Sequence, residues 1–280
     1  MWPGLCLNMS RWDALHTFAR DAGLGMVFGL GYPNPQRWDS ENALALLEYT
    51  ARNNQSLFGV ELGEEMAPSP GTAAFENLVE AYSNLRKGVE SIRWPQGKPP
   101  LILGPCVGMH NEEPGLGFAF TRAFLKRTLG AGTLDAVVMH SYNNDGGDDW
   151  ARPGFLVSTT ACKQTLSPGC GFKRMMAPQG QTLEQAETML AATRASSATT
   201  PLWCGECGPH NAGGLPNVTD TFMSSFWYAD ALAGLAKLGL AQFGRQALVG
   251  GNYALLQERT FTPNPVSQRR FSPAYQKKQG

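Results

Sequence analysis

Charged residues are scarce and evenly balanced in this chain of 280 residues. They make up 16% of the sequence, with 23 Lys plus Arg against 23 Asp plus Glu. No basic stripe is present, so we expect no nucleic-acid partner. No apolar run approaches the roughly 18 residues that a membrane-spanning helix needs, and we therefore expect no transmembrane segment. The N-terminus lacks the basic and apolar regions of a signal peptide, and none is expected in the chain as written.

Cysteines are also few for a chain of this length. Six of them do not make a disulfide framework. Cys162 and Cys170 bracket a loop, and whether they pair stays open. Cys204 and Cys207 form a C-x-x-C motif, but the second half that a zinc or redox site needs is absent. Small buried residues are the favoured interpretation of this pair.

Glycine and proline are plentiful, with 32 and 19 residues, and they divide the chain into alternating strands and helices. The first helix carries Leu15, Phe18 and Ala19 on one face, and Gly104-Pro105 is expected to stop the third strand. Helices are predicted at 10–22, 40–52, 73–92, 118–129, 182–197 and 219–237, and strands at 26–30, 57–65, 101–103, 134–142, 202–206 and 241–249. This order predicts a parallel sheet with crossover helices, either a (β/α)8 barrel or, as the alternative, a doubly wound sheet.

A long, irregular, glycine-rich insertion is predicted at 143–178. Its acidic run, Asp145 to Asp149, suggests calcium at first sight. The run lacks the ligand spacing and the closing glutamate of a calcium loop, so a solvated loop is favoured.

Two predicted strands end in carboxylates. Glu206 closes an apolar strand and is followed by a glycine-rich turn, and the stretch Glu61–Glu65 closes another. A carboxylate in such a place must be hydrogen-bonded or face a cleft, because an unpaired buried charge is very costly. Strand ends of this kind carry the active site in (β/α)8 barrels. A pair of carboxylates allows the acid–base and nucleophilic chemistry of a retaining glycosidase.

Several stretches resemble one known family. Glu61–Glu65 resembles an E-L-G-N-E motif, and Trp203–Glu206 resembles W-x-G-E. The stretch Arg245–Leu256, with the sequence RQALVGGNYALL, is similar to a further block, as is Cys6–Asp13. From about residue 5 to 265 the chain resembles the heparanase-like endo-β-glucuronidases of glycoside hydrolase family 79, nearest the plant type.

The resemblance implies roles for individual residues. Glu65 takes the acid/base role and Glu206 the nucleophile role. His140 and Tyr142 match a His-x-Tyr beside the nucleophile, where Tyr142 would hydrogen-bond Glu206 and keep it ionised. Without the resemblance, His140 would be interpreted as a hydrogen-bonded core histidine.

The resemblance also implies a site for the carboxylate of the sugar. Gly213, Gly214, Asn252 and Tyr253 match that family's substrate-binding residues, and free backbone N–H groups suit an anion. A Gly-Gly pair on its own is usually a turn. Glu64 departs from the family because it replaces the asparagine that holds the sugar 2-hydroxyl, and a carboxylate accepts hydrogen bonds but cannot donate them.

The fold implied by the resemblance is an incomplete (β/α)8 TIM barrel, with about six of eight strands and the first two missing. Residues 1–265 would form the partial barrel and 266–280 an unrelated polar tail in place of the family's β-sandwich domain. The implied activity is hydrolysis of β-glucuronides, with a carbohydrate substrate containing glucuronic acid and no metal or cofactor. The alternatives are an inactive relative that binds acidic sugars at most, and a barrel glycosidase of another specificity.

The same resemblance implies a secreted, lysosomal or vacuolar, or membrane-associated protein. Three glycosylation sequons, at Asn8, Asn54 and Asn217, are meaningful only in the secretory pathway. With two strands missing, the strands at 26–30 and 243–249 would be open sheet edges. We therefore expect the chain as written to be insoluble or inactive.

Overall fold

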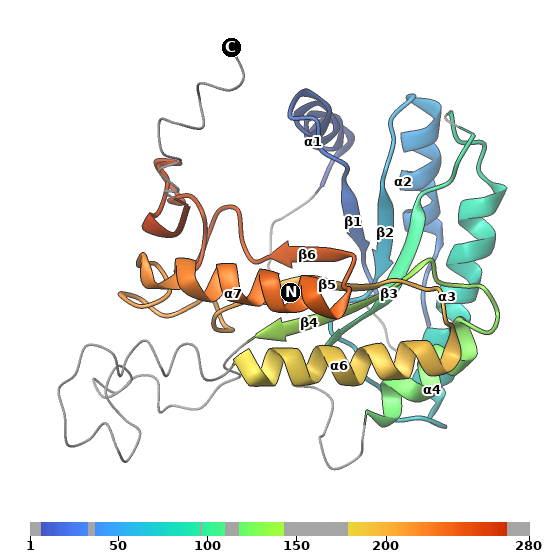
Figure 1. Ribbon diagram of the computed structural model, residues 1–280. Coiled ribbons are helices and arrows are strands. Elements are labelled where there is room, and N and C mark those ends of the chain that lie inside the picture. Colours follow the sequence, from blue (N-terminus) through green and yellow to red (C-terminus); the bar gives the residue numbers. More distant parts are fainter. Residues whose placement is uncertain (1–6, 33–36, 96, 110–117, 143–178, 268–280) are drawn as a thin grey trace. The chain divides into compact units, whose positions relative to one another are not determined.

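The computed structural model describes residues 7–32, 37–95, 97–109, 118–142 and 179–267. Helices and strands alternate along the chain (Figure 1). In order they are α1 (Met9–Asp21), β1 (Val27–Leu30), α2 (Glu41–Arg52), β2 (Gly59–Leu62), α3 (Ala73–Ser91), β3 (Leu101–Gly108), α4 (Ala119–Thr128), β4 (Ala136–Tyr142), α6 (Gln179–Ser196), β5 (Leu202–Gly208), α7 (Met223–Leu238), β6 (Gln242–Arg245) and the short 3-10 helix η4 (Pro265–Ser267).

The strands form one six-stranded sheet in which their order is β1-β2-β3-β4-β5-β6. The pairs β1–β2, β2–β3 and β5–β6 are parallel. A doubly wound sheet reverses its strand order at a switch point, whereas this sheet follows the order of the chain throughout. The architecture is therefore an incomplete (β/α)8 barrel, as predicted, and the doubly wound alternative does not apply.

Every predicted helix and strand is present, but several boundaries were wrong. Strand β2 ends at Leu62 and not at Glu65, and β5 continues beyond Glu206 to Gly208. Strand β3 does not stop at Gly104-Pro105 and continues to Gly108. Strand β6 ends at Arg245, four residues early, and α7 begins at Met223 and not at 219 or 220.

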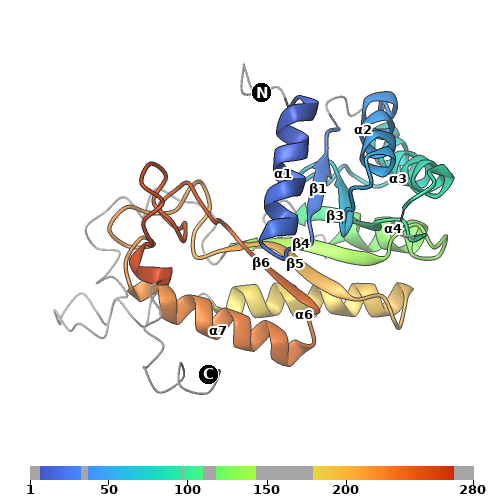
Figure 2. The same cartoon turned by 90° about the horizontal axis from the view of Figure 1, so that it is seen from above.

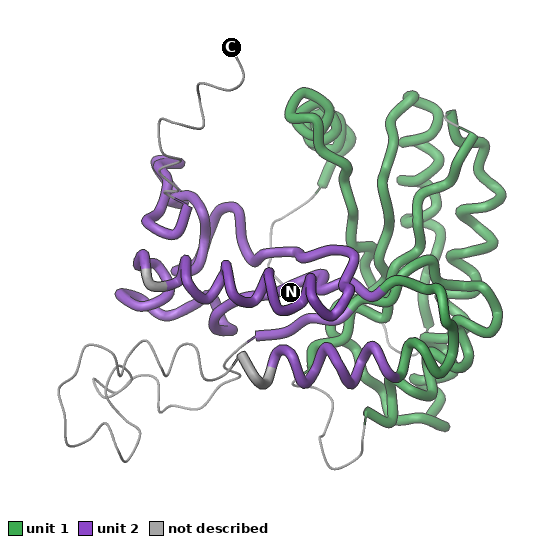
Figure 3. Tube along the Cα trace, in the orientation of Figure 1, with its two compact units in different colours: residues 1–138, 192–201 green, residues 139–191, 202–280 purple. Residues whose placement is uncertain are grey.

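Two compact units make up the chain (Figure 3). Unit 1 contains residues 1–138 and 192–201, and unit 2 contains residues 139–191 and 202–280. The predicted insertion at 143–178, with its acidic run and Cys162 and Cys170, lies outside the described residues. So does most of the predicted tail, and the domain boundary near residue 265 stays a prediction.

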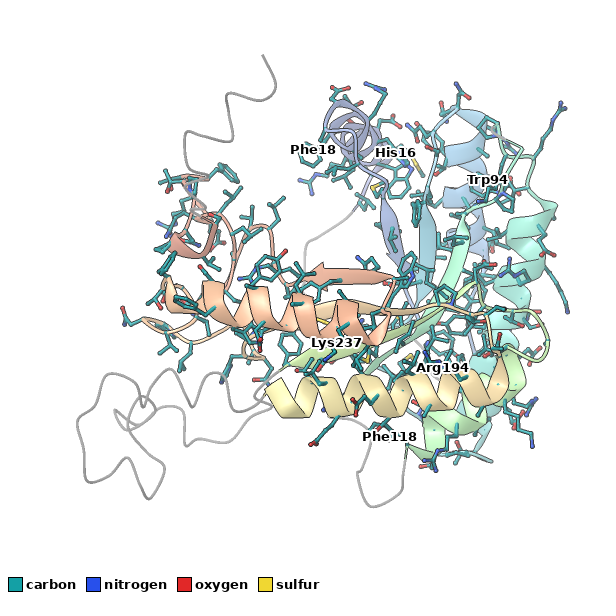
Figure 4. The ribbon with its side chains drawn as sticks, viewed as in Figure 1. His16, Phe18, Trp94, Phe118, Arg194 and Lys237 are labelled. Carbon is teal, nitrogen blue, oxygen red and sulfur yellow. A yellow bond between two sulfur atoms is a disulfide. The ribbon has the colours of Figure 1, made fainter. Side chains whose placement is uncertain are left out.

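The buried face of helix α1 in unit 1 was predicted only in part, because Ala19 is buried as expected but Leu15 and Phe18 are exposed. Trp12, His16 and Ala19 are its buried residues. Leu15 and Phe18 are 41% and 57% exposed, and Figure 4 labels Phe18 on this helix. The indole of Trp12 donates a hydrogen bond of 2.9 Å to the Thr50 hydroxyl of α2, so a polar contact helps to set which face is buried.

The core of unit 1 lies between its strands and the helices α2, α3 and α4, which lie on one side of β1 and β3 in Figure 2. Helix α3 begins where the Thr72 hydroxyl accepts a hydrogen bond from the Phe75 amide, a standard N-cap. It buries Tyr82, whose ring packs edge-on against Phe124 of α4. A side chain at Gly104 of β3 would collide with the Tyr82 hydroxyl, because its Cβ would lie 2.4 Å away. Glycine at this position therefore lets the helix reach the strand.

Among the described strands, β1 pairs with β2 alone. Leu24 and Val27, before and at the start of β1, are 58% and 37% exposed, and Phe58, directly before β2, is 53% exposed. The sequence predicted a buried strand here, and the finding is a half-exposed one. Apolar, unpaired edges of this kind are templates for aggregation.

In unit 2, helix α7 packs on strand β6. Trp227 and Ala231 are 1% and 3% exposed, and Tyr228 and Phe243 pack against them. Gly239, with φ +86°, ends the helix in the left-handed conformation that glycine favours. Among the described residues, no helix has the length and apolar character required to cross a bilayer.

Candidate active site

The carboxylates of unit 1 lie in and directly after strand β2. Glu61 is half-buried within the strand, Glu64 is exposed and Glu65 is half-buried. Gly63 turns the chain with φ +78°, and its amide donates a hydrogen bond of 3.0 Å to the Leu30 carbonyl. A Cβ at Gly63 would lie 2.9 Å from the Met66 sulfur, so this turn has no room for a side chain.

The backbone of Glu65 is fixed by strand β3. Glu65 has φ +47°, a left-handed conformation that costs a non-glycine residue energy. Its amide donates a hydrogen bond of 3.0 Å to the carbonyl of Cys106, which itself has φ +55°. One backbone hydrogen bond thus joins two residues in rare conformations. This arrangement sets the direction of the Cα–Cβ bond of Glu65.

Cys106 is a residue next to the site that the sequence reasoning missed. It is fully buried and is a free cysteine. Burial raises the pKa of its thiol well above the ordinary value, and the neighbouring charges of Glu61 and Glu64 add to this effect. The Tyr82 hydroxyl, also next to this thiol, donates a hydrogen bond of 3.0 Å to the Leu62 carbonyl. Cys106 is therefore a neutral packing group beneath the acidic loop. The G-P-C step in β3 was the only signal for it.

Residues 139–142 of β4 belong to unit 2, and alternate residues there face opposite sides, as in any strand. The Ser141 hydroxyl contacts α6, where it donates a hydrogen bond of 2.7 Å to the side-chain oxygen of Gln185. His140 and Tyr142 lie on the opposite face and are 3% and 6% exposed. The Tyr142 hydroxyl donates a hydrogen bond to Glu206 Oε1, which is the contact that the family resemblance implied.

Glu206 lies in an irregular part of strand β5. The β5–β6 pairing shifts register between Cys204 and Cys207, so this stretch is a bulge. Cys204 and Cys207 are buried, as expected, but they are bonded to each other in a disulfide. The interpretation as two small unpaired residues was wrong, because the bulge shortens the segment enough to bring both sulfurs together.

The predicted glycine turn and Tyr253 lie together in unit 2. Gly213 and Gly214 have φ +87° and +80°, which explains why both are glycine. The Asn252 amide donates a hydrogen bond of 2.6 Å to the Gly213 carbonyl. The Gly214 amide donates one of 3.0 Å to the Asn211 carbonyl. The Gly213 backbone also hydrogen-bonds the Tyr253 side chain. Neither glycine amide is free, contrary to the expectation.

Tyr253 connects this turn with the carboxylate. Burial raises the pKa of its hydroxyl, and the negative charge of Glu206 raises it further. Its side chain also hydrogen-bonds Tyr142 and Gln246. Tyr253 thus links Tyr142 and Glu206 with Gly213, and the Gly213 carbonyl in turn accepts the hydrogen bond from Asn252.

Arg245 contacts the backbone of Tyr253, and the sequence reasoning gave this arginine no role. Its guanidinium donates a hydrogen bond of 2.7 Å to the Tyr253 carbonyl. It stacks 5.4 Å from the ring centre of Trp227 and 4.7 Å from that of Tyr228. Burial lowers the pKa of Arg245 to about 10. Its place at the start of the stretch Arg245–Leu256, which resembles a block of the family, was the available signal.

The donor set is made of carboxylates, phenol hydroxyls and backbone amides, which suits an acetal substrate rich in hydroxyl groups. Glu64 and Glu65 belong to unit 1, and the Glu206 group belongs to unit 2. The predicted separation between the carboxyl groups of Glu65 and Glu206 stays a prediction.

Solved structures of similar fold are glycosidases. A family 44 endoglucanase from Clostridium acetobutylium matches with a TM-score of 0.57 at 17% identity, covering 84% of this chain and 59% of that one. The GH39 enzyme from Xanthomonas axonopodis pv. citri matches with a TM-score of 0.56 at 15% identity, covering 95% and 55%. At these identities the matches define the fold alone, the barrel class to which these enzymes belong.

Sequence comparison identifies the family. Residues 2–233 match the model of "Glycosyl hydrolase family 79, N-terminal domain". The chain therefore belongs to glycosyl hydrolase family 79.

Named relatives support the same assignment. Heparanase-like protein 2 of Arabidopsis thaliana is 30% identical over 275 residues, covering 93% of this chain and 46% of the relative. Baicalin-beta-D-glucuronidase of Scutellaria baicalensis is 28% identical, covering 93% and 49%. Heparanase of Bos taurus is 27% identical, covering 90% and 43%. The chain spans about half the length of these relatives.

Proposed function

We propose that this protein is a retaining glycoside hydrolase that cleaves β-glucuronides. The observation that carries the proposal is the Glu206 carboxylate on β5, hydrogen-bonded by Tyr142 and linked through Tyr253 to the Gly213 turn. Membership in family 79 and the names of a glucuronidase and a heparanase among the relatives support the substrate class.

The proposed mechanism is double displacement. Glu206 attacks the anomeric carbon, while the Glu65 carboxylic acid gives its proton to the leaving oxygen. The glycosidic bond breaks, and a covalent glycosyl-Glu206 intermediate forms. Glu65, now a carboxylate, takes a proton from water, and the resulting hydroxide displaces Glu206 from the sugar. The mechanism requires the two carboxyl groups to lie roughly 5–5.5 Å apart.

The glucuronide carboxylate would bind at the turn of Gly213 and Gly214, beside Tyr253. Because both glycine amides have partners within the chain, an entering carboxylate must take over the hydrogen bonds that the Tyr253 hydroxyl and the Asn211 carbonyl now make. We propose that this exchange favours an anionic sugar over a neutral one, since an anion accepts such hydrogen bonds more strongly.

Trapping tests the proposal. The full-length protein is incubated with a mechanism-based fluoro-glucuronide inactivator, digested and analysed by mass spectrometry. Labelling of Glu206 is expected, and a Glu206→Gln variant serves as the control that stays unlabelled. Labelling of another residue would contradict the assignment.

Exposed Glu64, next to Glu65 where the family motif has asparagine, favours a second candidate, an inactive binder of acidic sugars. Saturable binding of glucuronic acid without labelling or turnover would support this candidate. A panel of nitrophenyl glycosides separates a third candidate, a barrel glycosidase of another specificity, because such an enzyme would prefer a neutral glycoside.

A further inference from the structure

The Cys204–Cys207 disulfide encloses Glu206. Only Gly205 and Glu206 separate the bonded cysteines, which are 0% and 1% exposed. Their Cα atoms lie 6.3 Å apart. Three steps of a regular strand span about 10 Å, at about 3.3 Å each. A disulfide requires Cα atoms within about 7 Å, so the bond and a regular strand are incompatible at this place.

The register shows how the segment is shortened. Cys204 pairs with Phe243 and Cys207 pairs with Arg245, so three steps along β5 oppose two steps along β6. Gly205 and Glu206 thus share a single partner position, that of Gly244. A Cβ at Gly244 would lie 2.0 Å from the Gly205 carbonyl oxygen, so β6 approaches the bulge closely and has no room for a side chain.

This bulge determines which face of the sheet Glu206 occupies. Phe243 and Arg245 both contact aromatic rings of α7, so their partners Cys204 and Cys207 belong to the helix-facing side. In a regular strand, Glu206 would lie two residues after Cys204 and would share that side. With the extra residue it lies on the opposite side, where its carboxylate meets Tyr142.

We propose that the Cys204–Cys207 disulfide is a positioning device for Glu206, and that a thiol reductant disables it. This inference rests on the proposed function. A dithiol supplies two electrons and two protons, the S–S bond breaks into two thiols, and the dithiol closes to its own disulfide. Without the bond the segment extends toward regular spacing, and the carboxylate leaves Tyr142.

Both sulfurs are buried, so the dithiol reaches them when β5 and β6 separate transiently. The Gln246 amide reports this event, because it donates a hydrogen bond of 2.9 Å to the Cys207 carbonyl directly after the bulge. Its hydrogen exchange can be followed without any substrate. The proposal therefore has a readout that does not depend on glucuronide turnover.

The experiment compares the full-length wild type with a Cys204→Ser/Cys207→Ser variant, each before and after treatment with dithiothreitol. Alkylation and mass spectrometry count the free thiols on the peptide that contains Glu206. Reduced wild type is expected to show two new thiols, at least tenfold faster exchange at Gln246, and a kcat for an aryl glucuronide lower by about 10²-fold, the typical cost of an ångström-scale misplacement. KM should change far less. The variant should show the exchange rate and the kcat of reduced wild type, and dithiothreitol should change neither.

Three results would overturn the proposal: two free cysteines in the untreated protein, unchanged exchange at Gln246 after reduction, or an unchanged kcat in protein whose two thiols have been counted. If the untreated protein shows no turnover of any glucuronide, the proposed function fails on its own. The exchange measurement then still decides whether the disulfide fixes the bulge. If the variant does not fold, the reduced wild type supplies the same measurements.

Discussion

The hydrogen bond from Tyr142 to Glu206 allows a quantitative prediction. A Tyr142→Phe substitution removes the hydroxyl and keeps the ring, which packs closely over Gly208, where a Cβ would lie 2.5 Å from Tyr142 Cε1. Tyr142 is only 6% exposed, so water does not readily replace the lost donor. A hydrogen bond to a charged group contributes about 1.5–3 kcal/mol. Since each 1.36 kcal/mol is a factor of ten in rate, kcat should fall roughly ten- to 150-fold.

The assay is steady-state hydrolysis of an aryl glucuronide by the full-length protein, with thermal unfolding of both proteins measured in parallel. The rate of inactivation by the fluoro-glucuronide should fall with kcat, because both reactions need the Glu206 carboxylate. Tyr49→Phe is the matched control, since its hydroxyl donates a hydrogen bond of 3.0 Å to Asp13 in unit 1. A kcat within twofold of wild type in a folded Tyr142→Phe variant would refute the reasoning.

Three further substitutions test the site and its support. Glu64→Asn should raise glucuronide turnover, because an amide can both donate and accept at the sugar 2-hydroxyl; equal kcat values for Glu64→Asn and wild type would place that side chain outside the site. Tyr82→Phe should lower the free energy of unfolding by about 1–3 kcal/mol, since it leaves a buried carbonyl unpaired. Burial raises the pKa of Tyr82, so its contribution to stability is complete below about pH 10 and falls as the pH rises further; the variant should lose less stability there in urea titrations. Gly214→Ala, whose Cβ would lie 2.6 Å from the Thr219 hydroxyl, should raise KM for a glucuronide, whereas Gly239→Ala, equally left-handed but in open space, should not.

The alternation of strands and helices was predictable from sequence because apolar runs and glycine or proline breaks mark each element. The wrong end of β3 shows what such local signals miss. Its pairing with β2 ends at Leu103, so Pro105, which has no amide hydrogen, does not interrupt that ladder and the strand continues beyond it. The pairing partner of a residue is set by tertiary structure, which local sequence signals do not report.

The same limit applies to helix α1 and to the site. Periodicity placed Leu15 and Phe18 on the apolar face, but the contact between Trp12 and Thr50 of another helix helps to select the face that is buried. The family resemblance gave the residues of the Glu206 group, and the Tyr142 contact agrees with it. The disulfide beside Glu206 could not be predicted, because it depends on the register between β5 and β6. The role of Arg245 could not be predicted either, because it depends on contacts with Tyr253 and with α7.

The left-handed backbone of Glu65 implies a conflict between the chemistry of this residue and the durability of the fold. At φ +47°, glycine fits without penalty, whereas a glutamate costs roughly 1–2 kcal/mol. A Glu65→Gly protein should therefore have a higher melting temperature than a Glu65→Ala protein, although both lack the carboxyl group. If the alanine variant melts at the same temperature or higher, the loop relaxes around the substitution. If the Glu65→Gly variant melts at the higher temperature, selection for heat resistance alone would favour replacement of Glu65 by glycine. Only selection for turnover would then keep the glutamate.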